Sequence, residues 1–293
     1  MVLGFKEYQA QGLHLAQQLG CSYQQVKVHY FPDSECKVTL PAGLPEHVIL
    51  CLSLDRPNNK LIELLFAAKT ARRLGAQRLT LVAPYLCYMR QDKAFEAGEA
   101  VSQSIIGQML ADLFDDVITV DPHLHRTLYL EDAIPVSHTV TLSASEMMRE
   151  FLCQDEKFNN NTLLLGPDAE SEQWVSRIAD GCGLDYAVAR KKRLGDRELS
   201  IELPELEFSD KHIVVVDDVI SSGETVAIAA KGCFERGAKQ VNVLVTHALF
   251  AHNAIERLQQ VGINGIWSTD SIPHPTNQIS LAGLLAAAVQ EIA

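Results

Sequence analysis

Short apolar runs alternate along this chain with longer stretches that have helical spacing, which is the pattern of an α/β protein. The predicted strands are residues 2–5, 26–30, 48–54, 79–83, 117–120, 162–165, 187–189, 213–216, 241–245 and 263–268. The clearest predicted helices are residues 59–74, 101–114 and 280–292. Strands separated by helices of this length predict mainly parallel sheets flanked by helices.

The second half of the chain repeats part of the first half. The segment AAKTARRLGAQRLTLV, which starts at Ala67, aligns without a gap with AAKGCFERGAKQVNVL, which starts at Ala229. Continuing that register backwards places Asp217 on Asp55. The first copy lacks the second acid, the hydroxyls and the glycine that follow Asp217. We therefore expect two domains of one fold, residues 1–145 and residues 146–293.

The composition is typical of a globular protein without a membrane-spanning segment. Apolar residues make up 47% of the 293 residues, which is too high for a disordered chain. No apolar run reaches the roughly 18 residues that a membrane span requires. The first residues show no basic region followed by a long apolar one, as a secretory signal would. We expect a cytoplasmic protein with no membrane partner.

The net charge bears on the binding partners, and the cysteine content bears on the redox state of the thiols. The formal net charge is −12, which argues against a nucleic-acid partner. The seven cysteines are scattered, form no CxxC pair, and lie in several cases within apolar runs. We expect those within apolar runs to be buried thiols, as in a cytoplasmic protein.

Residues 213–225, IVVVDDVISSGET, combine a buried strand with the groups that a phosphorylated sugar requires. Two carboxylates stand where the predicted strand ends, and they can accept hydrogen bonds from sugar hydroxyls. Hydroxyls and N–H groups at the start of the following helix can bind a phosphate. The alternative is that one acid or serine only caps the helix. The candidate sugar-phosphate residues are Asp217, Asp218, Ser221, Ser222, Gly223 and Thr225.

The segment DDVISSGET resembles the phosphoribosyl pyrophosphate (PRPP) loop of type I phosphoribosyltransferases and PRPP synthetases. The resemblance implies that the two acids bind the ribose 2- and 3-hydroxyls and that the loop binds the 5-phosphate. The motif alone does not separate these two kinds of enzyme.

Further motifs, in order across both halves, resemble those of PRPP synthetase, also called ribose-phosphate pyrophosphokinase. In the first half FPDSE is similar to the family's FSDGE, PYLCYMRQDK to PYxxYxRQDR, and VDPH to VDLH. In the second half PD matches SPD, KKR matches KRR, and THALF and TDSIP resemble THxxF and TDTIP. This series covers nearly the whole chain and is more specific than the PRPP loop.

The resemblance implies two tandem type I phosphoribosyltransferase-like domains with the sugar-phosphate loop intact only in the second. It implies transfer of the pyrophosphoryl group of ATP to the 1-hydroxyl of ribose 5-phosphate, which gives PRPP and AMP. The cofactor would be Mg²⁺, and the protein a homo-oligomer built from dimers, with a tetramer or hexamer as options. The implied site residues are Phe31, Asp33, Glu35, Arg90 and Gln91 for ATP, Asp121, His123 and Asp168 for the metal, and Lys191 and Arg193 as catalytic cations.

This chain also departs from the family pattern. Ser34 stands in place of a glycine, Glu170 and Ser171 replace paired glycines, and Glu224 replaces another glycine. Two other functions therefore stay open: a phosphoribosyltransferase that uses PRPP, and a non-catalytic regulatory paralogue. The motifs of the first half argue against the transferase, and retention of the cationic and acidic residues argues against the paralogue.

Overall fold

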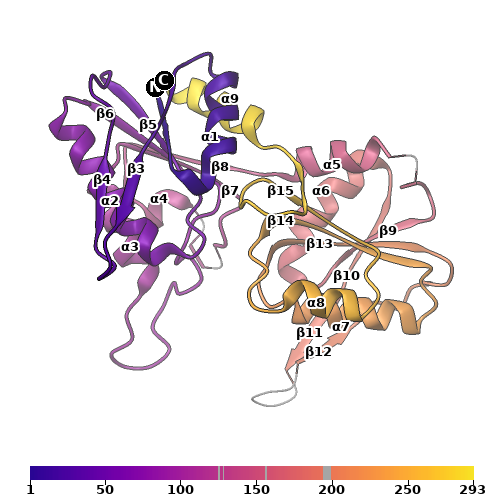
Figure 1. The fold of residues 1–293 in the computed structure, drawn as a ribbon. Coiled ribbons are helices and arrows are strands. Elements are labelled where there is room, and N and C mark those ends of the chain that lie inside the picture. Colours follow the sequence, from indigo (N-terminus) through magenta and orange to yellow (C-terminus); the bar gives the residue numbers. More distant parts are fainter. Residues whose placement is uncertain (125, 128, 156, 194–198) are drawn as a thin grey trace. The chain divides into compact units, whose positions relative to one another are not determined.

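A computed structural model describes residues 1–124, 126, 127, 129–155, 157–193 and 199–293 of the chain. The chain forms two compact units (Figure 1). Unit 1 contains Met1–Ser143 together with Leu281–Ala293, and unit 2 contains Ala144–Ser280. No helix in this described part combines the length and apolar character needed to cross a membrane.

Unit 1 is built on a six-stranded parallel sheet in the order β2-β1-β5-β6-β7-β8. Its strands are β1 (Val2–Gly4), β2 (Tyr23–Gln25), β5 (His47–Cys51), β6 (Arg78–Val82), β7 (Asp116–Val120) and β8 (His138–Leu142). Its helices are α1 (Gln9–Gln18), α2 (Pro57–Arg73), α3 (Ser102–Ala111), α4 (Leu130–Ala133) and α9 (Ala282–Ile292), with the 3-10 turn Lys6–Tyr8 before α1. A separate antiparallel hairpin, β3 (Lys27–Tyr30) and β4 (Cys36–Thr39), lies beside α2.

Unit 2 repeats this plan with the parallel order β10-β9-β13-β14-β15-β16. Its strands are β9 (Thr162–Gly166), β10 (Asp185–Val188), β13 (His212–Ile220), β14 (Gln240–Ala248), β15 (Gly265–Thr269) and β16 (Asn277–Ile279). Its helices are α5 (Ser145–Cys153), α6 (Glu172–Cys182), α7 (Glu224–Glu235) and α8 (Ala254–Gln260), with the 3-10 turn Ala169–Ser171 before α6. The antiparallel hairpin β11 (Arg190–Arg193) and β12 (Leu199–Glu202) projects from this unit (Figure 1).

Both sheets have a switch point, where the strand order reverses. In unit 1 the chain moves from β1 outward to β2 and then returns to add β5 on the other side of β1. In unit 2 the same reversal separates β9 from β13. The carboxyl ends of the strands that flank such a point form the usual ligand site of an open α/β sheet. These two edges are therefore equivalent positions in the two units.

The central strand is longer than its apolar run predicts. Strand β13 does not end before the acids but continues through Asp217 and Asp218 to Ile220. It continues because its pairing with β14 extends to Ile220 opposite Ala248, whereas its pairing with β9 stops at Val215. The two acids consequently lie on a strand that has lost one of its neighbours.

The strand pairing also corrects the register of the internal repeat. The aligned residues Leu79 and Val241 lie on β6 and β14, and they pair with Val48 and Ile213. The position equivalent to Asp217 is therefore Leu52, and the earlier match to Asp55 was wrong by three positions. The cause is the helix that follows. Helix α2 has 17 residues whereas α7 has 12. The gap-free alignment therefore holds at the ends of these helices and beyond but misaligns the residues that precede them.

The C-terminal helix α9 packs in unit 1, although the sequence placed it in the second domain. It contacts α1, β7 and β8, and it buries Leu285, Ala286 and Val289. A helix with an apolar face needs a partner surface, and here that surface is distant in the sequence. A single boundary at residue 145 therefore does not separate the two units, because residues 281–293 belong to unit 1.

Two cysteines contradict the expectation of free thiols. Cys153 and Cys182 form a disulfide with their Cα atoms 5.8 Å apart. They end the adjacent helices α5 and α6, so 29 residues of sequence separation conceal their proximity. Cys51, Cys87 and Cys233 are buried free thiols, as expected, and Cys21 and Cys36 are free but partly exposed.

Candidate active site

Three carboxylates meet at the switch point of unit 2. Asp217 and Asp218 lie on β13 beyond the last residue that pairs with β9, and Asp168 follows the end of β9. Burial, and then the nearby carboxylates of Asp218 and Asp168, raise the pKa of Asp217 well above its ordinary value. Such crowding of like charges is costly unless a cation or hydroxyl donors approach the carboxylates. The arrangement suits the hydroxyls of a sugar diol.

Local backbone hydrogen bonds fix the orientation of these acids. The N–H of Asp218 donates to Asp217 Oδ1 at 3.0 Å, and the N–H of Val219 donates to Asp218 Oδ1 at 2.7 Å. The N–H of Glu170 donates to Asp168 Oδ1 at 3.1 Å. Glu170, which replaces a family glycine, thus orients Asp168 through its backbone N–H.

The loop after β13 has the geometry of an anion cradle. Gly223 has φ +70° and precedes the first residue of α7. The first turn of a helix exposes N–H groups that have no partner within the helix. The hydroxyls of Ser221 and Thr225 make no hydrogen bond to any other described group, and Ser222 Oγ accepts from the N–H of Glu224 at 3.4 Å.

Helix α8 supports this loop, which the sequence alone did not indicate. Arg257 Nη1 donates to the carbonyl of Ser222 at 3.2 Å, and the N–H of Ala251 donates to the carbonyl of Ser221 at 2.9 Å. The first bond ties the loop to α8, and the second ties it to the turn between β14 and α8. One sequence signal could have revealed this role. Arg257 lies in the first turn of the helix that follows the motif THALF, residues 246–250.

Two late motifs form a buried polar network at the ends of β14 and β15. The hydroxyls of Thr269 and Ser271 both donate to the carbonyl of Thr246, at 2.6 and 2.8 Å. His247 Nδ1 lies 3.0 Å from Ser271 Oγ, and all four residues are buried. The network joins two neighbouring strand ends beside the acid pair.

The basic cluster lies on the projecting hairpin of unit 2. Lys191 is exposed on β11, where it pairs with Ile201 of β12. Arg193 is the last residue of β11, and its side chain lies outside the described part of the structure, as do residues 194–198. The sequence-based role of both cations stays a prediction.

The residues expected to bind the nucleotide base lie at the tip of the β3–β4 hairpin in unit 1. The ring of Phe31 is 42% exposed and contacts His29 edge-on at 5.0 Å. Asp33 Oδ1 accepts from the N–H of Glu35 at 3.1 Å. Ser34, which replaces a glycine, has φ +71°. The tip therefore keeps the turn that the missing glycine would form, and it presents an aromatic face next to two carboxylates.

The phosphate-side residues of unit 1 follow β6. Arg90 is exposed, and Gln91 Oε1 accepts from the hydroxyl of Ser102 at 3.1 Å. The next residue, Asp92, has a side chain only 1% exposed and bonds Arg126 Nη1 at 2.7 Å. This ion pair, which the sequence analysis did not identify, ties the loop after β6 to the loop after β7.

The three expected metal ligands come from two different units. Asp121 and His123 follow β7 in unit 1, and Asp168 follows β9 in unit 2. Asp121 is buried and has φ +37°, a strained conformation for a residue with a side chain. Within the described ranges no group of three or more His, Cys, Asp or Glu side chains is arranged to hold a metal ion.

Comparison with known proteins identifies the family. Residues 1–113 match the domain described as the N-terminal domain of ribose phosphate pyrophosphokinase, and residues 144–261 match the phosphoribosyl transferase domain. A ribose-phosphate pyrophosphokinase of Methanopyrus kandleri is 33% identical over 294 residues, which cover 100% of this chain and 99% of that protein. One of Sulfolobus acidocaldarius is 30% identical and covers 91% of this chain and 92% of that protein.

A solved structure agrees with the fold. The phosphoribosylpyrophosphate synthetase of Mycobacterium smegmatis superposes with a TM-score of 0.84 at 22% identity, over 100% of this chain and 98% of that chain. This similarity confirms the expected fold class, two parallel-sheet α/β domains with flanking helices. With the full-length sequence matches, it leads to one conclusion: the chain belongs to the ribose-phosphate pyrophosphokinase family.

Proposed function

We propose that this protein transfers the pyrophosphoryl group of ATP to the 1-hydroxyl of ribose 5-phosphate, giving PRPP and AMP. The observation that carries the proposal is the acid pair and anion cradle at the switch point of unit 2. A sugar phosphate needs both parts, since carboxylates bind its hydroxyls and a helix N-terminus binds its phosphate.

On the sugar side, Asp217 and Asp218 would accept hydrogen bonds from the 2- and 3-hydroxyls. The 5-phosphate would lie on the loop of residues 221–225, where hydroxyls and first-turn N–H groups donate. Because Arg257 and the N–H of Ala251 already hold the loop carbonyls, the loop needs little rearrangement to bind an anion. Preorganisation of this kind reduces the cost of binding.

On the nucleotide side, Phe31 would stack on the adenine while Asp33 and Glu35 accept from its amino group. Arg90 and Gln91 would hold the ATP phosphates. The ion pair of Asp92 with Arg126 would keep the two loops of this side at a fixed spacing.

In the transfer step the ribose 1-hydroxyl oxygen forms a bond to the β-phosphorus of ATP. The bond from that phosphorus to the oxygen that bridges the α- and β-phosphates breaks, AMP leaves with that oxygen, and the hydroxyl proton is released. Lys191 and Arg193 would neutralise the charge that moves onto the bridging oxygen. Displacement at phosphorus depends chiefly on such positioning and charge neutralisation.

The metal ligands that the family resemblance implies, Asp121, His123 and Asp168, are not gathered within one unit. Mg²⁺ usually keeps few protein ligands and completes its shell with water and phosphate oxygens. When bound, Mg²⁺ would supply charge neutralisation at the phosphates. Asp121, His123 and Asp168 would supply the protein oxygen and nitrogen ligands.

Purified protein with ATP, Mg²⁺ and ribose 5-phosphate, followed for AMP and PRPP together, tests this function. Equal amounts of both products are expected. AMP without PRPP would mean that water accepts the transferred group, and neither product would favour a regulatory paralogue. Sedimentation or light scattering at the assay concentration tests the expected homo-oligomer, which an active monomer would contradict.

A further inference from the structure

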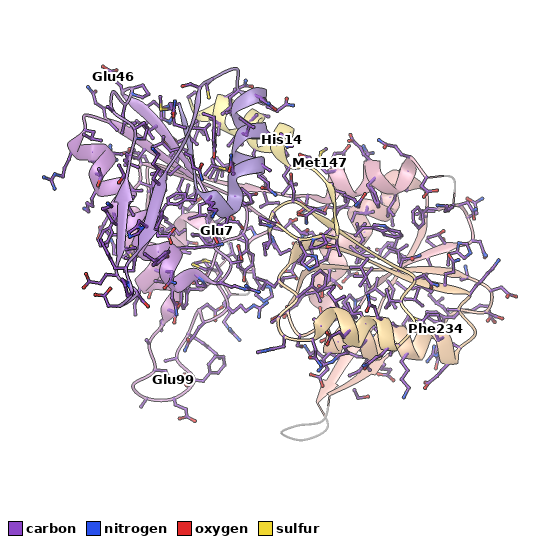
Figure 2. The ribbon with its side chains drawn as sticks, in the orientation of Figure 1. Glu7, His14, Glu46, Glu99, Met147 and Phe234 are labelled. Atoms are coloured by element: carbon purple, nitrogen blue, oxygen red, sulfur yellow. A yellow bond between two sulfur atoms is a disulfide. The ribbon has the colours of Figure 1, made fainter. Side chains whose placement is uncertain are left out.

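Unit 1 contains a cavity at its own switch point. The cavity has a volume of about 800 Å³, within the range of small-molecule sites. Its lining includes Phe5, Lys6 and Glu7, which directly follow β1, and Gln25 and Val26 at the end of β2. The lining also includes three residues at the start of α2: Arg56, Asn59 and Lys60. Figure 2 labels Glu7 at this edge of unit 1. The cavity thus occupies the place that the acid pair and its loop occupy in unit 2.

The chemistry of this edge differs from that of unit 2. The positions equivalent to Asp217 and Asp218 are Leu52 and Ser53, which are fully buried. Counted from these equivalent positions, α2 starts five residues after Leu52, whereas α7 starts seven residues after Asp217, and the serine-rich loop has no counterpart in unit 1. The helix is preceded by Arg56, with φ +48°, where unit 2 has Gly223 with φ +70°. A cation therefore stands at the helix start where unit 2 has a bare backbone.

Positive charge dominates the cavity wall in an otherwise acidic protein. Lys6, Lys27 and Arg56 line the cavity and form no ion pair or hydrogen bond through their side chains with any described residue. The two carboxylates of the wall are already engaged: Glu7 lies 3.8 Å from Lys60 Nζ, and Glu63 accepts from the hydroxyl of Tyr30. Three cations from three separate segments are thus available to one anionic ligand.

A buried cation forms part of the floor. The side chain of Lys60 is only 7% exposed, and its Nζ donates to Asp55 at 2.7 Å and to the carbonyl of Ser53 at 2.9 Å. These bonds hold its charge in place beneath the first turn of α2. A buried charge costs free energy unless it is paired in this way. The remaining wall has two polar residues, Gln25 and Asn59, and an apolar part formed by Phe5, Val26, Val28 and the ring of Tyr30.

We propose that this cavity is a second binding site, separate from the sugar-phosphate loop, for a small molecule with a phosphate or pyrophosphate group and an apolar body. The phosphate lies among Lys6, Lys27 and Arg56 near the start of α2, where the helix dipole also favours negative charge. The body lies against Val28 and Tyr30. The site needs no ribose hydroxyls, because it has no free acid pair to accept from them.

Lysine footprinting tests the site without reference to activity. The full-length protein is treated with a lysine acylating reagent alone and with millimolar inorganic phosphate, pyrophosphate, AMP or ribose 5-phosphate, and each lysine is quantified by mass spectrometry. Slower acylation of Lys6 and Lys27, with Lys37 and Lys69 unchanged, is expected from at least one probe. Protection by phosphate or pyrophosphate alone assigns an anion subsite, and stronger protection by AMP identifies the body, whereas ribose 5-phosphate, which has no apolar body, should protect no better than phosphate. No protection, or equal protection of all four lysines, would overturn the proposal.

A matched pair of arginine variants keeps both reporter lysines. Arg56→Gln should raise the probe concentration that gives half-protection on the order of ten-fold, since charge-assisted hydrogen bonds to phosphate are strong. Arg73→Gln, at the exposed far end of the same helix, should leave it unchanged. Equal midpoints in the two variants would remove Arg56 from the site. PRPP formation does not enter this readout, so a failure here is distinct from a failure of the proposed function.

Discussion

Arg78 donates two hydrogen bonds to the buried carboxylate of Asp116, from Nε at 2.8 Å and from Nη2 at 3.1 Å. Thr80 Oγ1 donates to the same carboxylate at 2.8 Å, and His138 Nδ1 lies 2.8 Å from it. Arg78, Asp116 and His138 are the first residues of β6, β7 and β8. Arg78 also donates to the carbonyl of Ile292 in α9. The amino ends of the strands thus form a structural network, opposite the edge that carries the candidate sites.

Asp116→Asn should destabilise the protein by on the order of 2–3 kcal/mol, because the buried carboxylate is the shared acceptor of Arg78, Thr80 and His138 and the counter-charge of the half-buried Arg78. Urea denaturation gives this free energy of unfolding. Asp112→Asn is the control, because Asp112 is exposed and, among the described residues, its carboxylate accepts a hydrogen bond only from Gln108. Similar small losses in both variants would show that the network contributes little.

The same network should make stability depend on pH. Arg78, Thr80 and His138 overcome the effect of burial and lower the pKa of Asp116. Its contribution is therefore fully present above the unfolded pKa of about 3.9 and is lost as the pH falls through the lower folded pKa. Denaturation midpoints should fall steeply below about pH 4 in the wild type and less steeply in Asp116→Asn.

His47 should make the folding stability depend on pH in a higher range than Asp116 does. Burial and the charge of Arg78 lower the pKa of His47. The unfolded chain therefore takes up a proton near pH 6.5, before the folded protein does, and stability declines as the pH falls below that value. His47→Gln should reduce this slope without removing it, since burial also lowers the pKa of His274. An unchanged slope between about pH 7 and pH 5 would contradict this assignment.

Gly107→Ala should destabilise unit 1 by about 3 kcal/mol, as overpacking does when the neighbour is backbone. A Cβ at Gly107 would lie 1.8 Å from the carbonyl oxygen of Ala133. Gly283→Ala, in the helix α9, meets no atom within 4 Å and should stabilise by up to about 1 kcal/mol through helix propensity. Urea denaturation of both variants checks the contrast, and equal effects would refute it.

Asp217→Asn combined with Asp218→Asn should weaken binding of ribose 5-phosphate and spare ATP. The reason is that unit 1 has Leu52 and Ser53 at the equivalent positions and no comparable acid pair. Calorimetric titration with each ligand measures both affinities. An unchanged affinity for ribose 5-phosphate would exclude the acid pair as the sugar site.

Lys191→Ala should lower kcat on the order of 10² or more with little change in the KM for ribose 5-phosphate. A cation that meets the phosphates chiefly as charge moves stabilises the transition state more than the bound substrate. Lys192→Ala is the matched control, since the family pattern gives this residue no equivalent role. Equal, mild losses in steady-state kinetics would mean that the cluster is only a solvated basic surface.

The sequence predicted the buried strands well and the exposed ones poorly. The apolar runs at residues 48–54, 79–83 and 117–120 correspond to β5, β6 and β7. Parallel strands buried on both faces need such continuous runs. Strand β8, HTVTL, was missed because it lies at the sheet edge and alternates polar with apolar residues.

For the candidate site, local motifs were informative and distant contacts were not. The acid pair and the loop at residues 221–225 could be read directly, because the strand, loop and helix are consecutive. The support from Arg257 and the ion pair of Asp92 with Arg126 depend on which loops meet in space. The register error at Asp55 arose because unit 1 has three more residues than unit 2 between the equivalent positions Leu52 and Leu79 (27 against 24 from Asp217 to Val241), and the longer helix takes them up without altering the surrounding hydrophobic pattern.

The return of α9 to unit 1 has a consequence for synthesis of the protein. Unit 2 is continuous in sequence and can complete its contacts once residue 280 has left the ribosome. Unit 1 begins first but finishes last, because the partner of α1 and the acceptor of the Arg78 hydrogen bond lie in residues 282–292. During translation, the α1 surface that α9 covers is exposed while all of unit 2 is made. Domains usually fold in the order of their synthesis, whereas here the unit that begins second is the first whose residues are all available.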